Sequence, residues 1–434
     1  MLDIRLIREN KNAVIENLRK RNLENLIPKV YECLEYDRKW KEVIKKLNEF
    51  RREKNKLSIE YSKSKNEEII KKVEEINEEI EKLEKEEKEL KEKRDWILKN
   101  LPNIMHESVP IGKDENDNVA IRYFGKIKVS KNNYEKIKNL YPVEIEIVDY
   151  EIPSHYDLMK KFVDTERASK TSGSRFFFLK DEVVILNFAL IRYGIDFLRE
   201  KGFKILYTPF LTRRFVEESA THLSDFEEVI YKIEEEDLYL IPTSEHSILG
   251  YHANEILSEE ELPLKYAGIS SCFRKEAGAH GKDTKGIFRV HQFEKVEQFV
   301  FSKPEESWNI HEELIRNAEE FYQSLKIPYR VVNICSGDLG YVAAKKYDLE
   351  AWFPGQLKYR ELVSCSNCTD WQARRANVRL RRKDGKVEYV HTLNSTLVAT
   401  QRTICAIFEN FYDGEKIVIP KVLRKYTNFK YILL

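Results

Sequence analysis

The residues with the clearest chemical potential lie in one stretch of the chain, residues 271–297, where two apolar segments flank a basic loop that contains glycine. Arg274 and Glu276 follow the first segment, and Phe293 lies in the second. A guanidinium binds phosphate oxygens in pairs, an aromatic ring stacks on a base, and a carboxylate accepts a hydrogen bond from an exocyclic amine. On two adjacent strands these residue types indicate an ATP site, although the hairpin taken alone also suits an ordinary charged surface.

Two later segments favour the nucleotide site over the plain hairpin. In residues 359–368, Glu361 and Ser364 offer hard oxygen ligands of the kind that Mg²⁺ takes beside a triphosphate. Residues 391–403 are expected to form a strand that runs into a helix, with Arg402 in the first turns of that helix. A second guanidinium and a metal-binding pair are suited to the charge that a triphosphate brings.

These residues must be positioned by a larger sheet, which the sequence predicts from about residue 180 onward. Many strands with few crossover helices indicate an antiparallel sheet flanked by helices, an α+β class. We expect strands at 204–207, 238–241, 268–273, 288–293, 296–301, 329–332, 358–364 and 387–392, and helices at 186–200, 245–256, 305–325 and 395–411.

Residues 28–99 predict a different kind of element, a long helical arm. They contain no glycine, and proline occurs only at Pro28, the entry point. Apolar residues between 73 and 90 follow the 3-4 spacing of a coiled-coil seam, which Glu87 and Arg94 interrupt. Turn-forming residues at 61–66 divide the stretch into two antiparallel helices, each roughly 45 Å long at 1.5 Å per residue.

The two predicted helices of the arm carry opposite charge. Residues 38–56 hold nine Lys or Arg against three Glu, whereas residues 67–92 hold twelve Glu against six Lys. Two interpretations explain this asymmetry equally well. The two helices attract each other and are solvated by their charges, or the first helix presents its basic side to a phosphate backbone. The basic residues proposed for that contact are Arg38, Lys39, Lys45, Lys46, Arg51 and Arg52.

Taken in order, these segments resemble a known family along essentially the whole chain. The hairpin at 272–297 resembles motif 2 of the class II aminoacyl-tRNA synthetases, residues 393–410 resemble motif 3, and residues 202–211 resemble motif 1. More specifically, the chain is identified as a member of the widespread, non-methanogenic type of seryl-tRNA synthetase. Further matching stretches are residues 1–10, Leu-Pro-Asn-Ile (101–104), Val-Pro-Ile-Gly-Lys-Asp-Glu (109–115), Gly-Ser-Arg-Phe (173–176), Pro-Thr-Ser-Glu (242–245), Gly-Asp-Leu-Gly (337–340), Tyr-Asp-Leu-Glu-Ala-Trp-Phe-Pro-Gly-Gln (347–356), Cys-Ser-Asn-Cys (365–368) and Gln-Ala-Arg-Arg (372–375).

The resemblance implies a domain plan and a reaction. A tRNA-binding domain is expected at 1–108, with the arm at about 28–99, and a class II catalytic domain at 109–434. The implied enzyme is a serine–tRNA ligase that activates L-serine with ATP and loads tRNA(Ser), with tRNA(Sec) as a further acceptor where it exists. Mg²⁺ is expected and zinc is not, and Pro209 would lie near a homodimer interface.

The resemblance also implies roles for individual residues. Arg274 grips the α-phosphate, Glu276 reads adenine and Phe293 stacks on it, while Arg402 reaches the γ-phosphate and Glu297 accepts from the serine hydroxyl. The implied catalytic residues are Arg274, Glu361 and Arg402, and the implied Mg²⁺ ligands are Glu361 and Ser364. The implied serine-binding residues are Thr243, Ser244, Glu245, Arg274, Glu297, Asn394 and Thr396. The implied ATP-binding residues are Arg274, Lys275, Glu276, Val290, Phe293, Glu361, Leu362, Val363, Ser364 and Arg402, and Lys282 and Lys285 join the six basic arm residues in facing tRNA.

The chain departs from the family pattern at three places. Residues 394–397 read Asn-Ser-Thr-Leu where many members have Asn-Gly-Ser-Gly, so the hydroxyl at Thr396 is kept in a bulkier form. Gln401 stands where glycine commonly precedes the motif 3 arginine, which puts the close approach of backbone to ATP in doubt. Residues 243–245 read Thr-Ser-Glu instead of the frequent Thr-Ala-Glu, a change expected to be neutral.

The overall composition excludes several classes of protein. A net charge of +1 over 434 residues excludes a uniformly basic nucleic-acid coat, and neither DNA nor a membrane is expected as a partner. Six thinly spread cysteines and a charged N-terminus indicate reduced thiols and a cytoplasmic setting. Cys365 and Cys368 form one C-x-x-C without a second pair nearby, so strand packing is favoured over structural zinc.

Two other functions stay open alongside the synthetase. A related ligase could adenylate an amino acid and pass it to a carrier protein, but it would have no use for the long arm. A catalytically silent relative could bind tRNA or a partner, but it would not need Arg274, Glu276, Glu361 and Arg402 together.

Overall fold

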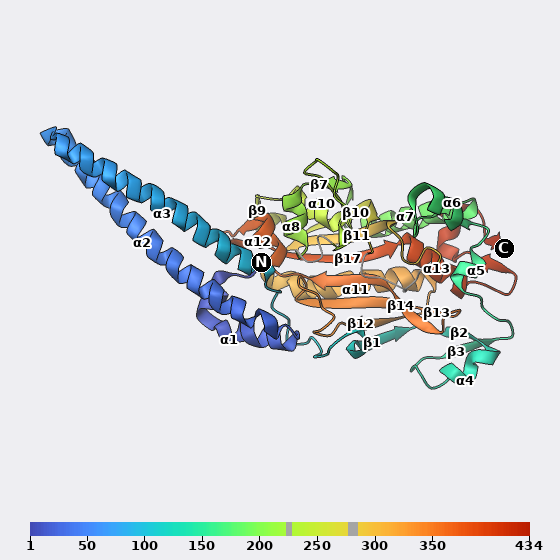
Figure 1. Ribbon diagram of the computed structural model, residues 1–434. Coiled ribbons are helices and arrows are strands. Elements are labelled where there is room, and N and C mark those ends of the chain that lie inside the picture. Colours follow the sequence, from blue (N-terminus) through green and yellow to red (C-terminus); the bar gives the residue numbers. More distant parts are fainter. Residues whose placement is uncertain (223–227, 277–284) are drawn as a thin grey trace. The chain divides into compact units, whose positions relative to one another are not determined.

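The computed structural model describes residues 1–222, 228–276 and 285–434, and the chain divides into two compact units, Met1–Ile104 and Met105–Leu434 (Figure 1). The first unit is helical and the second contains the sheets. Each unit has hydrophobic clusters of its own.

The first unit is a pair of short helical segments followed by the predicted arm (Figure 1). Asp3 caps its first helix, and the arm turns at Lys65, which has a left-handed backbone, and Asn66, whose side chain caps the returning helix. The antiparallel helical hairpin is therefore confirmed, with a tighter turn than expected because residues 61–64 still belong to the first helix. The helices are α1 (Ile4–Lys20), η1 (Glu24–Leu26), α2 (Ile27–Ser64) and α3 (Glu67–Asn100).

The two residues that interrupt the apolar seam of the arm form a polar network at its base. Trp40 Nε1 donates to Glu87 Oε1 at 2.7 Å, and the Arg94 guanidinium lies 4.6 Å from the Trp40 ring centroid. Arg94 also donates to the buried Asp37, which receives two further bonds from Arg8 of α1. Because buried charges need partners, this network fixes the register of α2 against α3.

The second unit is built on an eight-stranded sheet that is antiparallel at every step except the last. This confirms the predicted antiparallel sheet, since only the pairing of β10 with β6 is parallel. The order across the sheet is β1 (Val119–Phe124), β12 (Tyr329–Asn333), β13 (Lys345–Phe353), β14 (Lys358–Asn367), β17 (His391–Ala399), β11 (Gln292–Ser302), β10 (Leu264–Phe273) and β6 (Lys204–Tyr207).

Three long helices pack on this sheet through one large hydrophobic cluster. Leu186, Leu314 and Ile404 come from the three helices and share the cluster with Val300 and Val398 of the central strands. Burial of each such side chain contributes roughly 1.5–3 kcal/mol, so the centre of the sheet is a rigid platform. The helices are α7 (Glu182–Glu200), α11 (Ser307–Leu325) and α13 (Thr400–Asn410).

Smaller elements fill the connections of the second unit. The short helices are η2 (Glu115–Asp117), η3 (Lys131–Asn133), α4 (Tyr134–Ile137), α5 (His155–Leu158), α6 (Thr165–Ser172), α8 (Arg214–Ala220), α10 (Ser244–Tyr251), η4 (Glu259–Glu261), η5 (Pro304–Glu306), α12 (Trp371–Ala376), η6 (Lys421–Leu423) and α14 (Arg424–Thr427). The short strands are β2 (Ile127–Ser130), β3 (Ile145–Val148), β4 (Val163–Asp164), β5 (Phe178–Leu179), β7 (Leu211–Thr212), β8 (Tyr239–Leu240), β9 (Ile256–Ser258), β15 (Arg379–Arg381), β16 (Val387–Tyr389), β18 (Lys416–Val418) and β19 (Tyr431–Leu433).

Some predicted element bounds were wrong. The strand expected at 288–293 begins only at Gln292, and the helix expected at 395–411 begins only at Thr400. Residues 391–399 extend instead as β17, because their β-branched and apolar side chains are buried between β11 and β14. The helix expected at 245–256 ends at Tyr251.

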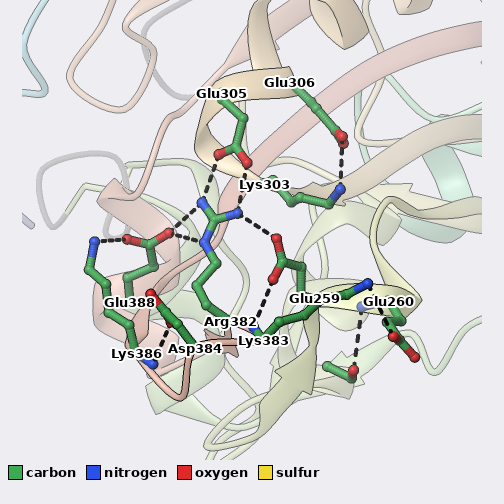
Figure 2. Close-up of polar contacts among 11 residues, drawn as sticks. Glu259, Glu260, Lys303, Glu305, Glu306, Arg382, Lys383, Asp384, Lys386 and Glu388 are labelled. Carbon is green, nitrogen blue, oxygen red and sulfur yellow. Dashed lines mark hydrogen bonds and ion pairs between the residues drawn. The ribbon is translucent and has the colours of Figure 1, made fainter.

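A cluster of ion pairs around Arg382 ties three of the smaller elements together (Figure 2). The Arg382 guanidinium contacts Glu259 of η4, Glu305 of η5 and Glu388 of β16, at 3.0, 2.7 and 2.5 Å. Glu259 also accepts a backbone hydrogen bond from Lys383. One side chain therefore links segments that lie more than a hundred residues apart in sequence.

Within the described parts of the chain, no helix combines the length and hydropathy needed to cross a bilayer.

Candidate active site

A cavity of about 360 Å³ opens over the central strands of the second unit. It lies over the hairpin of β10 and β11, whose register pairs Cys272 with Phe293 and so brings the start of β11 beside the end of β10. Its walls include Thr243, Glu245, Arg274, Glu276, Val290, Phe293, Glu297, Glu361, Leu362, Ser364, Asn394, Thr396 and Arg402.

One end of the cavity holds the first of two carboxylates, Glu245 at the start of α10. Thr243 caps this helix by accepting from the Glu245 backbone N–H at 3.2 Å. Gln372 and Asn394 both donate to Glu245 Oε1, at 2.6 and 3.1 Å. The side chain is therefore held by two donors on one oxygen while it borders the cavity.

Gly268 permits the close packing of α10 on β10 that places this carboxylate. A Cβ at Gly268 would lie 2.5 Å from Ser244 Oγ and 2.7 Å from Ile248 Cδ1, which is closer than atoms can approach. Ser244 is fully buried against this strand and does not line the cavity.

The second carboxylate, Glu297 of β11, is buried beside Lys295 and Thr396. Lys295 forms an ion pair with Glu297 Oε2, and Thr396 Oγ1 donates to the same oxygen at 3.3 Å. Burial raises the pKa of Glu297, although the Lys295 charge opposes that shift. The three side chains make a polar floor that can accept from a small hydroxyl group.

The hairpin ends in a cation and an aromatic face. The Arg274 guanidinium lies 5.1 Å from the Phe293 ring centroid and donates through Nε to the Pro242 carbonyl at 3.3 Å. Glu276 accepts from Arg289 Nη1 at 3.0 Å. An aromatic ring beside a guanidinium group suits a flat, anionic ligand such as a nucleotide.

The cavity also holds an arginine paired with a partly exposed glutamate. Arg402 Nη1 lies 3.3 Å from Glu361 Oε2, and its guanidinium lies 5.0 Å from the ring centroid of Phe288. Burial works against ionisation of Glu361, but the charges of Arg402, Lys346 and Arg274 outweigh it and lower the pKa of this carboxyl. Glu361 is therefore an anion at neutral pH.

The oxygen donors around Glu361 suit a divalent cation held together with phosphates. Asp348 lies opposite Ser364 in the β13–β14 register, and its Oδ1 is buried without a hydrogen-bond partner among the described residues. Burial and the nearby Glu361 and Glu350 charges raise the pKa of Asp348 to about 8. An orphaned oxygen beside a glutamate and a serine fits Mg²⁺, which takes one or two carboxylates plus substrate phosphates.

Gln401, the departure in motif 3, is part of a buried network. Its Oε1 accepts from the Glu294 backbone N–H at 2.9 Å, and its Nε2 donates to Glu294 Oε2 at 2.6 Å and to Asn187 Oδ1 at 3.2 Å. The larger side chain is thus satisfied and joins α13 to β11 and α7.

Three of the predicted serine- and ATP-binding residues, Ser244, Lys275 and Val363, do not line this cavity, and neither do the described residues predicted to contact tRNA. Val363 is fully buried in the hydrophobic cluster, and Ser244 is fully buried against β10. The Lys275 backbone N–H donates to the Val229 carbonyl. Lys285 lies 5.7 Å from the Tyr156 ring, and Lys282 is outside the described residues. The six basic arm residues are exposed, and Arg38, Lys39 and Arg51 form ion pairs with nearby glutamates.

Several residues of the site were missed by the sequence reasoning. Lys295, Lys346 and Asp348 are charged residues on central strands of the sheet, and Gln372 is a fully buried amide. Burying a charge within a strand costs free energy unless the charge is paired or takes part in a site. The sequence Lys-Tyr-Asp (346–348) therefore could have indicated that this strand contributes to the site.

The two C-x-x-C cysteines are buried at the edge of this site. Cys368 Sγ accepts from Asn394 Nδ2 at 3.6 Å. In the ranges that the structure covers, no three His, Cys, Asp or Glu side chains are grouped to hold a metal ion.

Comparison with known proteins places this geometry in a family. The description "Seryl-tRNA synthetase N-terminal domain" matches residues 1–105, and "tRNA synthetase class II core domain (G, H, P, S and T)" matches residues 228–411. A serine–tRNA ligase of Pyrococcus horikoshii is 56% identical over 444 residues, covering 100% of this chain and 98% of its own. The chain belongs to the seryl-tRNA synthetase family. It is thus an aminoacyl-tRNA ligase.

Solved structures of seryl-tRNA synthetases agree with this assignment. The crystal structure of the Pyrococcus horikoshii enzyme complexed with ATP matches with a TM-score of 0.95 at 56% identity, covering 100% of this chain and 99% of that one. The cytoplasmic enzyme of Naegleria fowleri in complex with AMP matches with a TM-score of 0.87 at 42% identity, with coverage of 100% and 99%. A prolyl-tRNA synthetase of Giardia lamblia, at 16% identity and a TM-score of 0.55, shares the fold alone.

Proposed function

We propose that this chain activates L-serine with ATP and transfers the seryl group to tRNA(Ser). The observation that carries the proposal is the pair of carboxylates, Glu245 and Glu297, in one cavity with Arg274. Glu245 suits the serine ammonium group, and Glu297 with Thr396 suits its hydroxyl. A small amino acid placed there would direct its own carboxylate toward the arginine.

In the activation step, the serine carboxylate attacks the α-phosphorus of ATP. A bond forms between carboxylate oxygen and phosphorus, the bond to the bridging oxygen breaks, and pyrophosphate leaves. Arg274 holds the α-phosphate and stabilises the charge that develops there, while Phe293, Glu276 and Val290 hold the adenine. Catalysis is then positioning plus charge stabilisation, without a protein nucleophile.

In the transfer step, a terminal ribose hydroxyl of tRNA attacks the seryl carbonyl carbon, and AMP leaves. We assign Glu361 and Ser364 as the residues that would hold Mg²⁺, with Asp348 beside them. Bound there, the ion would neutralise triphosphate charge. Arg402, which pairs with Glu361 and lines the cavity, would reach the γ-phosphate.

The arm is proposed to read tRNA. Its exposed basic residues on α2 would contact phosphates and overall shape, and Lys282 and Lys285 would approach the acceptor end. The same contacts would admit tRNA(Sec) if its shape matches that of tRNA(Ser).

A homodimer is proposed on the apolar surface around motif 1. Large apolar side chains are exposed along this segment, on α7, at the end of β6 and on α8: Ile185, Phe188, Tyr207 and Phe215. Exposed apolar side chains of this size are common at subunit interfaces. Sedimentation equilibrium should give twice the chain mass of 51.6 kDa.

One two-stage experiment separates this function from its alternatives. Serine-dependent ATP–pyrophosphate exchange is measured first, and charging of tRNA and of acyl-carrier proteins is measured second. We expect exchange with serine and charging of tRNA only. Exchange with carrier loading would favour the carrier ligase, and no exchange with any amino acid would favour a silent relative.

A further inference from the structure

A buried glutamine behind the cavity wall holds the carboxylate proposed to bind the serine ammonium group. Gln372 lies in α12, and its side chain is fully buried. It does not line the cavity, so it cannot contact a ligand there. Its Nε2 nevertheless donates to Glu245 Oε1 at 2.6 Å, the shortest hydrogen bond described here to that carboxylate.

The orientation of the Gln372 amide is fixed on both sides. Nε2 also donates to the Ala220 carbonyl at 3.0 Å, and Oε1 accepts from Thr392 Oγ1 at 2.7 Å. A flipped amide would point its oxygen at a carboxylate and a carbonyl, which are both acceptors. Thr392 therefore sets the direction in which Gln372 donates.

The same contacts connect three parts of the cavity wall. Ala220 ends α8 and lines the cavity, Glu245 begins α10, and Thr392 lies on β17 two residues before Asn394, the other donor to Glu245. Both donors use Oε1, and Oε2 receives no hydrogen bond from the described residues. Oε2 is thus the oxygen that remains for a ligand.

We infer that Gln372 is a positioning residue for serine: it locks Glu245 so that Oε2 meets the substrate ammonium group. The inference rests on the proposed function, because it assigns that ligand to Glu245. It predicts an effect on serine binding that is separate from ATP binding, since the Gln372 side chain bonds to Ala220, Glu245 and Thr392 and not to Arg274 or Arg402.

The first test replaces the amide by an apolar side chain of similar size, Gln372→Met. Hydrogen bonds to charged groups are strong enough that losing one should raise the KM for serine about tenfold to a hundredfold. The KM for ATP in the same exchange assay should stay within about twofold, as no nucleotide contact changes. A serine KM equal to that of the wild type would overturn the inference.

The second test uses Gln372→Glu, which keeps the shape and changes the hydrogen bonding. An ionised Glu at this place would face the Glu245 carboxylate and the Ala220 carbonyl, so one of the two carboxyls must bind a proton, with a raised pKa. The serine KM of the variant relative to wild type should therefore fall as pH drops from 8 to 6. A ratio that does not depend on pH would contradict this, because a purely structural role gives no such dependence.

Gln298→Met is the matched control for stability. Gln298 is a fully buried glutamine of β11 whose side chain bonds to Leu314 and Asn317 of α11. The Gln298→Met variant should lower the melting temperature about as much as Gln372→Met does, and it should leave the KM for serine near the wild-type value. If the wild type shows no serine-dependent exchange, the proposed function fails; if it does and Gln372→Met binds serine normally, the inference alone fails.

Discussion

At the scale of single residues, the cavity combines two carboxylates, which we propose bind a small amino acid, with two arginines, which we propose bind a nucleotide. Glu245, Glu297, Arg274 and Arg402 all line the same cavity. Each of these side chains is fixed by a neighbour, so the site is organised before any ligand arrives. Pre-organised charge is what accelerates a phosphoryl reaction that needs no covalent help from the protein.

Arg274 should contribute mainly to the chemical step. Arg274→Ala is expected to lower the rate of serine-dependent pyrophosphate exchange by about 10²–10³, the typical cost of removing one charge-stabilising donor. Arg122→Ala is the control, because Arg122 pairs with Glu319 and does not line the cavity. Normal exchange by Arg274→Ala would remove this residue from the mechanism.

Thr396 tests whether the bulkier residue of this chain still serves the hydroxyl contact. Thr396→Ser keeps the donor to Glu297 Oε2, so its KM for serine should stay close to wild type. Thr396→Val has the same shape without the hydroxyl and should raise that KM about tenfold, since a buried carboxylate loses a partner. Equal KM values for the two variants would show that the hydroxyl is not used.

At the scale of elements, the sheet positions the site and the ion pairs secure its surroundings. β10 and β11 supply the hairpin, the neighbouring strands β17 and β14 supply Asn394, Thr396 and Glu361, and α10 supplies Glu245. The Arg382 cluster joins η4, η5 and β16 outside the cavity (Figure 2). It should therefore matter for stability and not for substrate binding.

The Arg382 cluster predicts a pH-dependent stability difference. Its hydrogen bonds to Glu305 lower the pKa of that carboxyl to about 2, and the pKa of Glu388 and Glu259 is lowered as well. Carboxyls with a depressed pKa stabilise the fold fully above their unfolded pKa, and this contribution is lost as pH falls toward 2.

Arg382→Met should accordingly reduce the free energy of unfolding modestly at pH 7, because solvent screens these surface ion pairs. The difference from wild type should shrink between about pH 4.5 and pH 2. Lys265→Met, which removes one ion pair with Glu313, is the control and should cost less. Urea denaturation across this pH range measures both, and a difference that grows on acidification would disprove the assignment.

The arm should be needed for tRNA and not for serine. Replacing residues 48–83 by a short glycine-rich turn removes the outer part of α2 and α3 and keeps the polar network of Asp37, Trp40, Glu87 and Arg94. We expect tRNA charging to be lost while pyrophosphate exchange stays at the wild-type rate. Loss of both activities would make the arm a structural element of the enzyme.

At the scale of the whole molecule, the sequence was informative wherever local pattern determines structure. The arm follows from a glycine-free helical stretch, and the antiparallel sheet follows from many strands with few crossovers. The bounds of β17 could not be predicted, because its Thr-Leu-Asn-Ser-Thr-Leu-Val run becomes a strand only when β11 and β14 bury both sides. The interruption of the apolar seam by Glu87 and Arg94 likewise could not be explained from the sequence, because their hydrogen-bond partners Trp40 and Asp37 lie on the other helix of the arm.

The site was predicted through its motifs, and its supporting residues were not. Arg274, Glu297 and Glu361 belong to stretches that resemble family motifs, and the structure gathers them in one cavity. Gln372 and Lys295 act through contacts between segments far apart in the chain, which spacing alone does not reveal. Residues of this kind become visible only when burial and hydrogen bonds are known.

The central claim is that a polar floor of Glu297, Lys295 and Thr396 selects serine, and amino acid discrimination in pyrophosphate exchange tests it most directly. A site built to bond a hydroxyl rejects the analogue without it by about 10⁴–10⁵, because its buried polar groups would be left unpaired. We predict that kcat/KM for alanine falls below that for serine by this factor, and that threonine is excluded far less strongly. Activation of alanine within tenfold of serine would contradict the account.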